Sequence, residues 1–269
     1  MPQREAWWVG VPQREALWVG APGEVEAVNG VWLLAQSGGG PVIPDFGTGS
    51  KCETENHLFC WGWVQDHWGD TLQPALLEHL KLTVIAVAIG FAIAFVSALV
   101  AYRYRRLDQP IGLFSDFLYT IPSLALFQLL VPLTGLTVTT VEVALVSYTL
   151  LILYRNILEG LPGVPAEVRE AARGMGLTPL QTLFRVDLPL AAPAIIAGLR
   201  IATVSTISIA TVAAFVLPQG LGYPIFTGIK QDEFKTEIIA AGALTVLLAL
   251  GADALLVAVQ RSATRWRRA

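Results

Sequence analysis

The sequence predicts an all-α, polytopic membrane protein with about five transmembrane helices, and three observations lead to this fold class. Only 14% of the 269 residues are charged and 54% are hydrophobic, whereas soluble domains carry roughly 25% charged residues. The mean hydropathy is +0.57. Five apolar stretches also reach the length of about 20 residues that a helix needs to cross the hydrocarbon core of a bilayer.

The chain divides by composition into four parts, which are residues 1–50, 51–79, 80–260 and 261–269. The first part contains two near-identical segments, PQREAWWVG and PQREALWVG, followed by Gly- and Pro-rich sequence. Two copies are too few for a repeat protein, so we expect a disordered N-terminal extension. The third part holds the apolar stretches, and the last is a basic tail.

The second part, which we expect outside the cytoplasm, carries Trp61, Trp63 and Trp68 just before the first apolar stretch. Such a cluster is typical of the aromatic belt at a membrane surface. The alternative is an aromatic cage for a quaternary ammonium ligand. Cys52 and Cys60 are close enough in sequence to form a disulfide if this side of the membrane is oxidising.

Basic residues orient the five predicted spans, which are about residues 80–101, 112–133, 138–158, 191–217 and 238–259. Arginines cluster after the first span, between the third and the fourth, and after the fifth. The positive-inside rule places all three clusters in the cytoplasm. An odd number of spans then puts the N-terminus outside and the C-terminus in the cytoplasm.

Two charged residues fall inside predicted spans, Arg200 in the fourth and Asp253 in the fifth. Ionisable residues at membrane depth are expensive and usually functional. We expect the two at similar depth, where they form an ion pair. In the alternative, Arg200 reaches back to the interface and Asp253 faces a wet cavity. We assign both to a translocation path.

The second span contains a proline, in YTIPSLALFQLL. Pro122 frees a backbone carbonyl and can kink the helix, and Ser123 and Gln128 add polarity. We interpret the span as a bent helix that lines the path, with a packing kink as the alternative.

The loop after the fourth span, LPQGLGYPIFTGI, is rich in turn residues. Gly220 and Gly222 permit tight backbone turns on either side of Leu221. This outer loop either closes over the mouth of the path or is a plain re-entry turn.

A long polar stretch, PAEVREAARGMGLTPLQTLFRVDLP at residues 165–189, separates the third and fourth spans. Pro165 suits the first turn of a helix, and apolar residues then recur at three- and four-residue steps. A pair of glycines that includes Gly176 ends this helix. Thr178 is a good N-cap for a second helix, which we expect to end at Pro189. The stretch therefore predicts a helix-turn-helix elbow on the cytoplasmic side.

This elbow resembles the EAA loop of ABC-importer permeases. The family pattern is Glu-Ala-Ala, three residues, Gly, nine residues, an aliphatic residue, any residue, and Leu-Pro. With Val in place of the usual Ile, the pattern is met by Glu170, Ala171, Ala172, Gly176, Val186, Leu188 and Pro189. In that family the loop is the coupling helix that docks on a cytoplasmic ATPase, so the resemblance implies that these residues couple the chain to one. An ordinary amphipathic hairpin at the membrane surface is the alternative.

Further segments resemble the osmoprotectant branch of this family, which handles glycine betaine, carnitine, choline or proline betaine. They are YTIPSLALFQLLVPLTGL, AAPAIIAGLRIATVSTISIATVAAFV, and GLG followed by IFTGI. Gln219 departs from the branch, which usually has Gly there. In such systems a separate binding protein largely chooses the substrate. Two alternatives stay open. The chain could be an importer permease for another small solute such as an amino acid, or a membrane scaffold that does not transport.

The resemblance also implies partners and a location in a prokaryotic inner membrane. One chain of five spans supplies half of a path, so a second permease chain is needed, and we favour a paralogue over a second copy. A cytoplasmic ATPase would bind the ATP, and an extracytoplasmic binding protein would deliver the substrate.

Enzyme chemistry has no support in the sequence. It contains no P-loop, HExxH or CxxC motif, and its three histidines are well spread. We therefore expect no catalytic residue, metal or cofactor in this chain. The net charge of -3 gives no reason to expect nucleic-acid binding.

Overall fold

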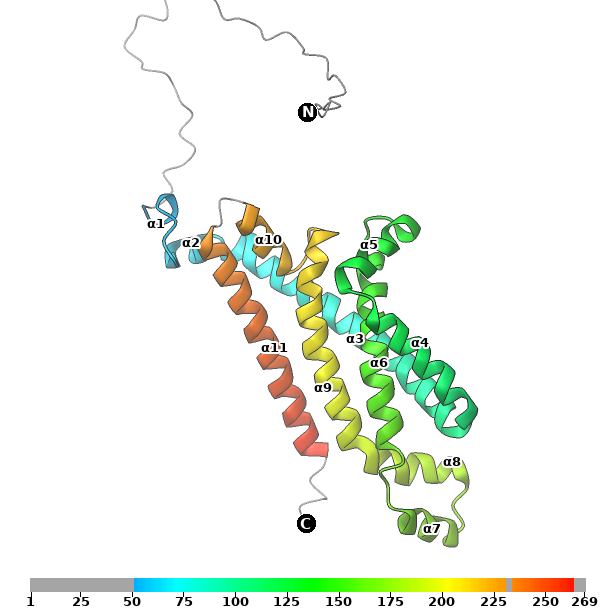
Figure 1. Cartoon of the computed structure of the whole chain (residues 1–269). Coiled ribbons are helices and arrows are strands. Elements are labelled where there is room, and N and C mark those ends of the chain that lie inside the picture. Colours follow the sequence, from blue (N-terminus) through cyan, green and yellow to red (C-terminus); the bar gives the residue numbers. More distant parts are fainter. Residues whose placement is uncertain (1–50, 231–233, 264–269) are drawn as a thin grey trace, which may run out of the picture. The chain divides into compact units, whose positions relative to one another are not determined.

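Helices make up the regular structure of residues 51–230 and 234–263, which are the residues that the computed structural model describes (Figure 1). These residues contain no strand, as the sequence predicts. All of them belong to one unit, Gly49–Ala269. The predicted extension at residues 1–50 and the end of the basic tail at residues 264–269 lie outside the described part.

Within the described residues, four helices are long and apolar enough to cross a membrane, and a bent pair of helices can count as a fifth span. The long helices are α3 (Gln73–Arg103), α6 (Val138–Gly160), α9 (Leu188–Val212) and α11 (Lys235–Ala263), and the bent pair is α4 (Asp108–Thr120) with α5 (Ser123–Thr134). The shorter elements are α1 (Lys51–Thr54), α2 (Trp61–Asp66), the π-turn η2 (Trp68–Leu72), the 3-10 turn η3 (Arg105–Leu107), α7 (Ala166–Gly174), α8 (Pro179–Thr182), the π-turn η4 (Leu183–Asp187), the 3-10 turn η5 (Ala213–Phe215) and α10 (Gly222–Lys230).

The first span is longer than the predicted 80–101, because the helical stretch begins at Trp68 and continues through α3. Glu78 and His79 do not interrupt the helix. Both accept hydrogen bonds from the backbone after α9, described below. A sequence pattern treats such polar residues as lying outside a span, whereas tertiary partners keep them inside the helix.

The second span is broken rather than kinked, which corrects the bent-helix prediction. The chain turns by 99° between α4 and α5. Ile121 and Pro122 both have extended backbone, with ψ of 127° and 136°. A proline disfavours helical geometry in the residue before it, which accounts for Ile121, and Pro122 is the N-cap of α5. The Tyr148 hydroxyl on α6 donates to the Ile121 carbonyl, and the Leu126 N–H donates to the Pro122 carbonyl at 2.9 Å. Irregular backbone at membrane depth requires such partners.

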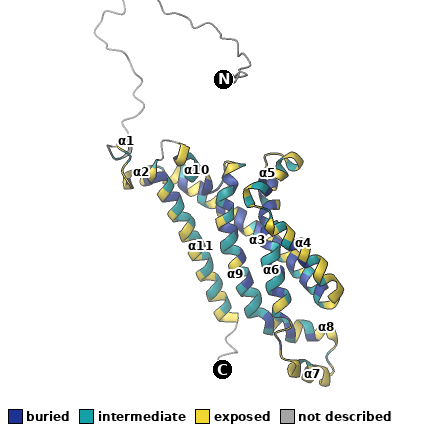
Figure 2. Ribbon diagram, in the orientation of Figure 1, coloured by how far each residue is buried: buried dark blue, intermediate teal, exposed yellow. Residues whose placement is uncertain are grey.

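Helix α6 packs against α3, α4, α5 and α9, and it supplies half of the largest fully buried side chains in the described residues. Figure 2 shows how buried and exposed positions are distributed over the helices. Two glycines allow this close packing. A Cβ atom at Gly90 of α3 would overlap the Thr149 hydroxyl of α6, and one at Gly198 of α9 would overlap Asn156 of α6. Small residues at helix contacts are typical of membrane bundles, since they let backbones approach.

Candidate functional site

The elbow of residues 165–189 has the helix-turn-helix form that the sequence predicts, and its local hydrogen bonds explain why. Helix α7 ends at Gly174, and Gly176 follows with a φ of +81°. The Gly176 N–H donates to Arg173 O at 2.9 Å and the Leu177 N–H donates to Ala172 O at 3.1 Å. This is the Schellman arrangement, which favours glycine at the left-handed position. Gly176 of the EAA pattern is therefore a helix stop.

The second elbow helix begins with a capping box at the predicted N-cap. The Thr178 hydroxyl accepts the Gln181 N–H at 3.3 Å, and the Gln181 side chain accepts the Thr178 N–H at 2.9 Å. Two backbone donors that a helix start leaves open are thus satisfied. The N-cap assigned to Thr178 from the sequence is confirmed.

The prediction that the second elbow helix ends at Pro189 is wrong, because Pro179–Phe215 forms one helical stretch. Proline lacks an N–H and normally disrupts the ladder of hydrogen bonds. Here the wider π-turn η4 precedes it, closed by the Leu188 N–H donating to Leu183 O. Pro189 then lies in the first turn of α9, where its missing donor is tolerated. The elbow is therefore continuous with the span after it.

One buried carboxylate ties the elbow to the ends of three spans. Asp187, 4% exposed, closes η4 just before α9. It accepts Arg169 Nε from α7 at 2.9 Å and the Tyr102 hydroxyl from α3 at 3.3 Å. Arg169 also donates to the Leu161 carbonyl, which caps α6. We call Tyr102, Leu161, Arg169 and Asp187 the elbow node. Sequence reasoning missed it, although an acid next to Leu-Pro was the available signal.

The EAA residues themselves divide into buried and exposed ones. Ala172 is buried, Val186 and Leu188 are half-buried, and Glu170, Ala171, Gly176 and Pro189 are exposed. Three large apolar side chains next to them also face outward, since Met175 is 73% exposed, Leu180 65% and Phe184 54%. The elbow thus presents a mixed apolar and charged surface.

The structure brings Arg200 and Asp253 together. Arg200 is the central residue of α9, and its Nε and Nη2 donate to the two Asp253 carboxylate oxygens of α11 at 2.8 and 3.1 Å. Nη1 reaches Gln260 Oε1 at 3.4 Å. Of the open alternatives, the ion pair is therefore the one formed. Pro122 and Gln128 are exposed and Ser123 half-buried at the break between α4 and α5, and no contact joins them to the ion pair in the described residues.

The outer loop is shorter than the predicted 217–229, because α10 begins at Gly222. Its turn is fixed to α3. Gly220, with a φ of +67°, donates its N–H to Glu78 Oε2 at 3.1 Å, and Leu221 donates its N–H to His79 Nδ1 at 3.2 Å. Because Nδ1 accepts, Nε2 carries the proton that His79 donates to the Ile207 carbonyl at 3.0 Å. A Cβ atom at Gly222 would overlap the carbonyl of Thr211 on α9.

The buried His79 is thus the residue that links α3, α9 and the outer loop. Sequence reasoning dismissed it as one of three spread histidines. The signal that could have found it is a polar pair, Glu78–His79, directly before a long apolar run.

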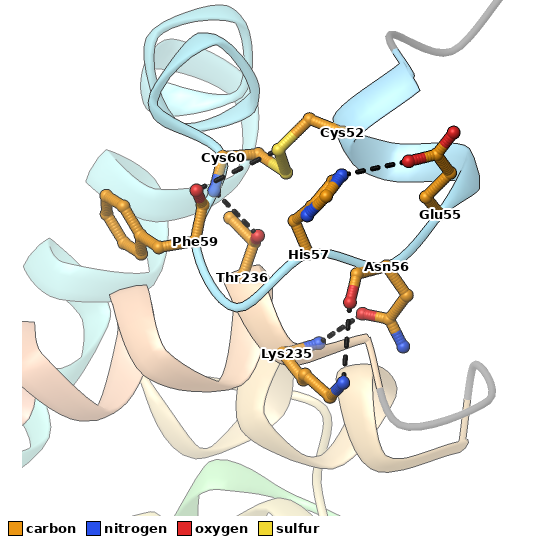
Figure 3. Close-up of a disulfide and its surroundings, with 8 residues drawn as sticks. All are labelled: Cys52, Glu55, Asn56, His57, Phe59, Cys60, Lys235 and Thr236. Carbon is orange, nitrogen blue, oxygen red and sulfur yellow. Dashed lines mark hydrogen bonds and ion pairs between the residues drawn. A yellow bond between two sulfur atoms is a disulfide. The ribbon is translucent and has the colours of Figure 1, made fainter.

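The segment before α3 is held on the start of α11 (Figure 3). Cys52 and Cys60 form a disulfide. The Cys60 N–H donates to the Thr236 hydroxyl at 2.9 Å, and the Lys235 N–H donates to the Asn56 side chain at 3.1 Å. The disulfide loop therefore caps the first turn of this span.

The three tryptophans of this segment do not form one cage. Trp63 is buried, with its ring 4.5 Å from the His67 ring and 5.3 Å from the Phe234 ring. Trp61 and Trp68 are exposed instead and line an apolar groove of about 390 Å³ beside α11. Of the two alternatives, the aromatic belt fits this arrangement better.

The family described as "Binding-protein-dependent transport system inner membrane component" matches residues 86–265. The chain belongs to this family. It is thus a multi-pass permease subunit of an ABC transport system that works with a binding protein, a transport component rather than an enzyme. The match begins after α1, α2 and the start of α3, so the disulfide loop lies outside it.

Curated relatives align with this chain over most of their own length. The choline transport system permease protein OpuBB of Bacillus subtilis is 35% identical over 75% of this chain and 92% of its own. The glycine betaine/carnitine/choline transport system permease protein OpuCB of the same organism is 34% identical over 70% of this chain and 86% of its own.

A solved structure of the MetNI methionine ABC transporter, in an inward-facing conformation, has the same fold. It superposes with a TM-score of 0.64 at 21% identity, over 72% of this chain and 96% of that one. At this identity the likeness concerns the fold.

Proposed function

We propose that this permease carries osmoprotectants that bear a quaternary ammonium group, such as glycine betaine, carnitine and choline. Two relatives at 34% and 35% identity are named for these solutes. The amino-acid alternative is weaker, because its support is the fold of a transporter at 21% identity. A scaffold without transport has no relative among the proteins described above.

The elbow is the ATPase-docking surface of this proposal, and its geometry is the observation that carries it. Met175, Leu180 and Phe184 are large apolar side chains that are exposed on the elbow, and Glu170 of the same elbow is exposed as well. Exposed apolar patches of this kind mark protein interfaces. A groove on an ATPase would cover these side chains and would contact the Glu170 carboxylate.

The elbow node would pass the movement of a bound ATPase to the spans. Arg169 lies on α7, and its partners lie at the ends of α3, α6 and α9. An elbow that is continuous with α9 moves that helix as a lever. Closure of an ATPase dimer would thus reach the path through fixed contacts instead of a flexible linker.

The remaining partners follow from a path built of two halves. A second permease chain, which we take to be a paralogue, supplies the other half. A binding protein meets the end that carries α10 and the disulfide loop, and the elbow faces the cytoplasm. This orientation puts the N-terminus outside, in keeping with the arginines after α3 and α11. Pro122, Ser123 and Gln128 at the span break are the path residues of the second span.

The test is purification of the tagged full chain from its native membrane, with mass spectrometry of its partners and uptake of labelled choline and glycine betaine. We expect an ABC ATPase, a second permease and a binding protein, and uptake of at least one solute. A chain that purifies without an ATPase would refute the docking role of the elbow. A complete complex that takes up neither solute would refute the proposed substrates.

A further inference from the structure

Two grooves flank the pair of helices α9 and α11, and they differ in chemistry. One, of about 620 Å³, lies between this pair and α3 and is lined by residues such as Leu80, Phe91 and Leu199. The other, of about 660 Å³, is lined by α9 and α11 alone and contains the ion pair. Three hydroxyl residues, Ser205, Ser208 and Thr245, line the second groove as well. We call it the ion-pair groove.

The ion pair faces this groove instead of being sealed between the helices. The Arg200 and Asp253 side chains remain 32% and 36% exposed, although they contact each other through two hydrogen bonds. A half-open ion pair at the centre of a span is costly against lipid tails. Its exposed side therefore suits a polar solute or water.

Arg200 has a second side-chain partner besides Asp253. Its Nη1 donates to Gln260 Oε1, and the Gln260 amide donates to the Pro193 carbonyl at 3.1 Å. Gln260 of α11 thus links the Arg200 guanidinium to the Pro193 carbonyl of α9. A rigid fork of donors binds a carboxylate with two parallel hydrogen bonds.

From this geometry we infer that Arg200 and Asp253 form a binding site for a small zwitterion, with its carboxylate on Arg200 and its quaternary ammonium on Asp253. The inference rests on the proposed function and names the solute class at one of its path sites. When no solute is bound, Arg200 and Asp253 bind each other in its place. Entry of a zwitterion exchanges one ion pair for two, and no net charge enters the span.

Such an exchange gives weak, reversible binding, because the solute has to replace an interaction already present. A transport path needs a site that a solute can both enter and leave. The groove volume of about 660 Å³ falls within the range of roughly 300–1,000 Å³ of small-molecule sites. The hydroxyl residues Ser205, Ser208 and Thr245 add polar groups to the lining of the groove.

A comparison of glycine betaine with choline tests whether the ion pair binds the solute or is only structural. Choline has the ammonium group but no carboxylate, so it cannot use a carboxylate site on Arg200. The decisive variant is Arg200→Lys, which retains the charge and the pairing with Asp253 but loses the fork. In the complete importer we expect the maximal uptake rate of glycine betaine to fall about tenfold and that of choline to fall less than about twofold. Thr203→Val, which lies in the apolar groove, is the matched control and should change neither rate.

Solute binding to Arg200 can also be measured without transport, on the full chain in membranes. Phenylglyoxal modifies exposed guanidinium groups, and mass spectrometry reports Arg200 separately from Arg185 of the elbow. We expect glycine betaine to protect Arg200 and choline not to protect it, with Arg185 modified equally in both cases.

The outcomes distinguish the two proposals. An equal loss of both uptake rates in Arg200→Lys, or no loss at all, would show a structural ion pair and overturn the site. Equal protection by the two solutes, or none, would overturn it too. If the wild-type importer carries neither solute, the proposed function fails, and protection of Arg200 by glycine betaine alone would still support the zwitterion site.

Discussion

Arg169 on the first elbow helix donates to Asp187 at the end of the second, with 2.9 Å between Nε and Oδ1. Asp187 is almost fully buried, and it also accepts the Tyr102 hydroxyl from α3. The two elbow helices are therefore locked together where they meet the spans. This contact fastens α7 to the start of α9.

Asp187→Ala should loosen the elbow and uncouple ATP hydrolysis from uptake. Removing one partner of a buried ion pair leaves the other uncompensated, and we expect a local loss of about 3 kcal/mol. Limited proteolysis of the complex should cut the segment between Gly163 and Thr178 faster in the variant. Glu167→Ala, which changes an exposed acid on α7, is the control. Equal cleavage of the two variants would exclude Asp187 as the lock.

Glu170→Lys should abolish uptake and co-purification of the ATPase while the chain still inserts into the membrane. Glu170 is exposed, and exposed substitutions usually change the free energy of unfolding by about 0.5 kcal/mol or less. The loss would thus arise at the docking surface. Glu55→Lys makes the same charge change at an exposed acid in the disulfide loop and should retain both properties. Normal uptake by Glu170→Lys would remove this residue from the coupling surface.

Gly90→Ala should destabilise the packing of α3 on α6. The added Cβ would overlap the Thr149 hydroxyl, and overpacking typically costs about 1–3 kcal/mol. Thermal unfolding in detergent should show a lower midpoint, and the double variant Gly90→Ala with Thr149→Gly should recover more of the loss than the one with Thr149→Ala, because the Thr149 Cβ itself would lie 2.9 Å from the added one. Gly242→Ala in α11, where a Cβ meets nothing within 4 Å, should be neutral or slightly stabilising. A wild-type midpoint for Gly90→Ala would contradict the close approach.

His79→Leu should free the outer loop from α3. The substitution leaves the Leu221 N–H without its acceptor and the Ile207 carbonyl without its donor, and a buried unsatisfied group costs about 1–3 kcal/mol. Hydrogen–deuterium exchange of residues 219–224 should rise at least several-fold. His57→Leu, in the exposed disulfide loop, should leave this exchange unchanged. Unaltered exchange in His79→Leu would show that the loop is held by other contacts.

The sequence predicts well wherever the deciding contacts are local. Thr178 and Gln181 cap each other three residues apart. Helix α7 ends just before Gly176, where the Gly176 N–H bonds a carbonyl three positions earlier and the Leu177 N–H bonds one five positions earlier. Both features were visible from residue type and spacing. The apolar stretches were likewise visible, although their predicted ends were too short by several residues at α3 and α11.

The sequence predicts poorly wherever a helix continues or breaks for a tertiary reason. Pro189 was expected to end a helix, but a π-turn before it carries the helix through. Pro122 was expected to kink one, but the chain turns by 99° there because the Tyr148 hydroxyl of another helix satisfies the broken backbone. A proline in the sequence therefore indicates that a helix is disturbed at that point, but it does not tell whether the helix continues or breaks.

By itself, the sequence determined the fold class through its composition, the elbow through hydrogen bonds between near neighbours, and the family through its resemblance to the EAA pattern. The tertiary structure decided which polar groups meet. Asp187 and Tyr102 are 85 residues apart and Leu221 and His79 are 142 apart, and neither contact was expected. Arg200 and Asp253 are 53 residues apart, and the sequence offered their ion pair as one of two alternatives. Buried polar groups need partners, but a chain can satisfy that need in many ways, and only the packing of α3, α6, α9 and α11 selects one.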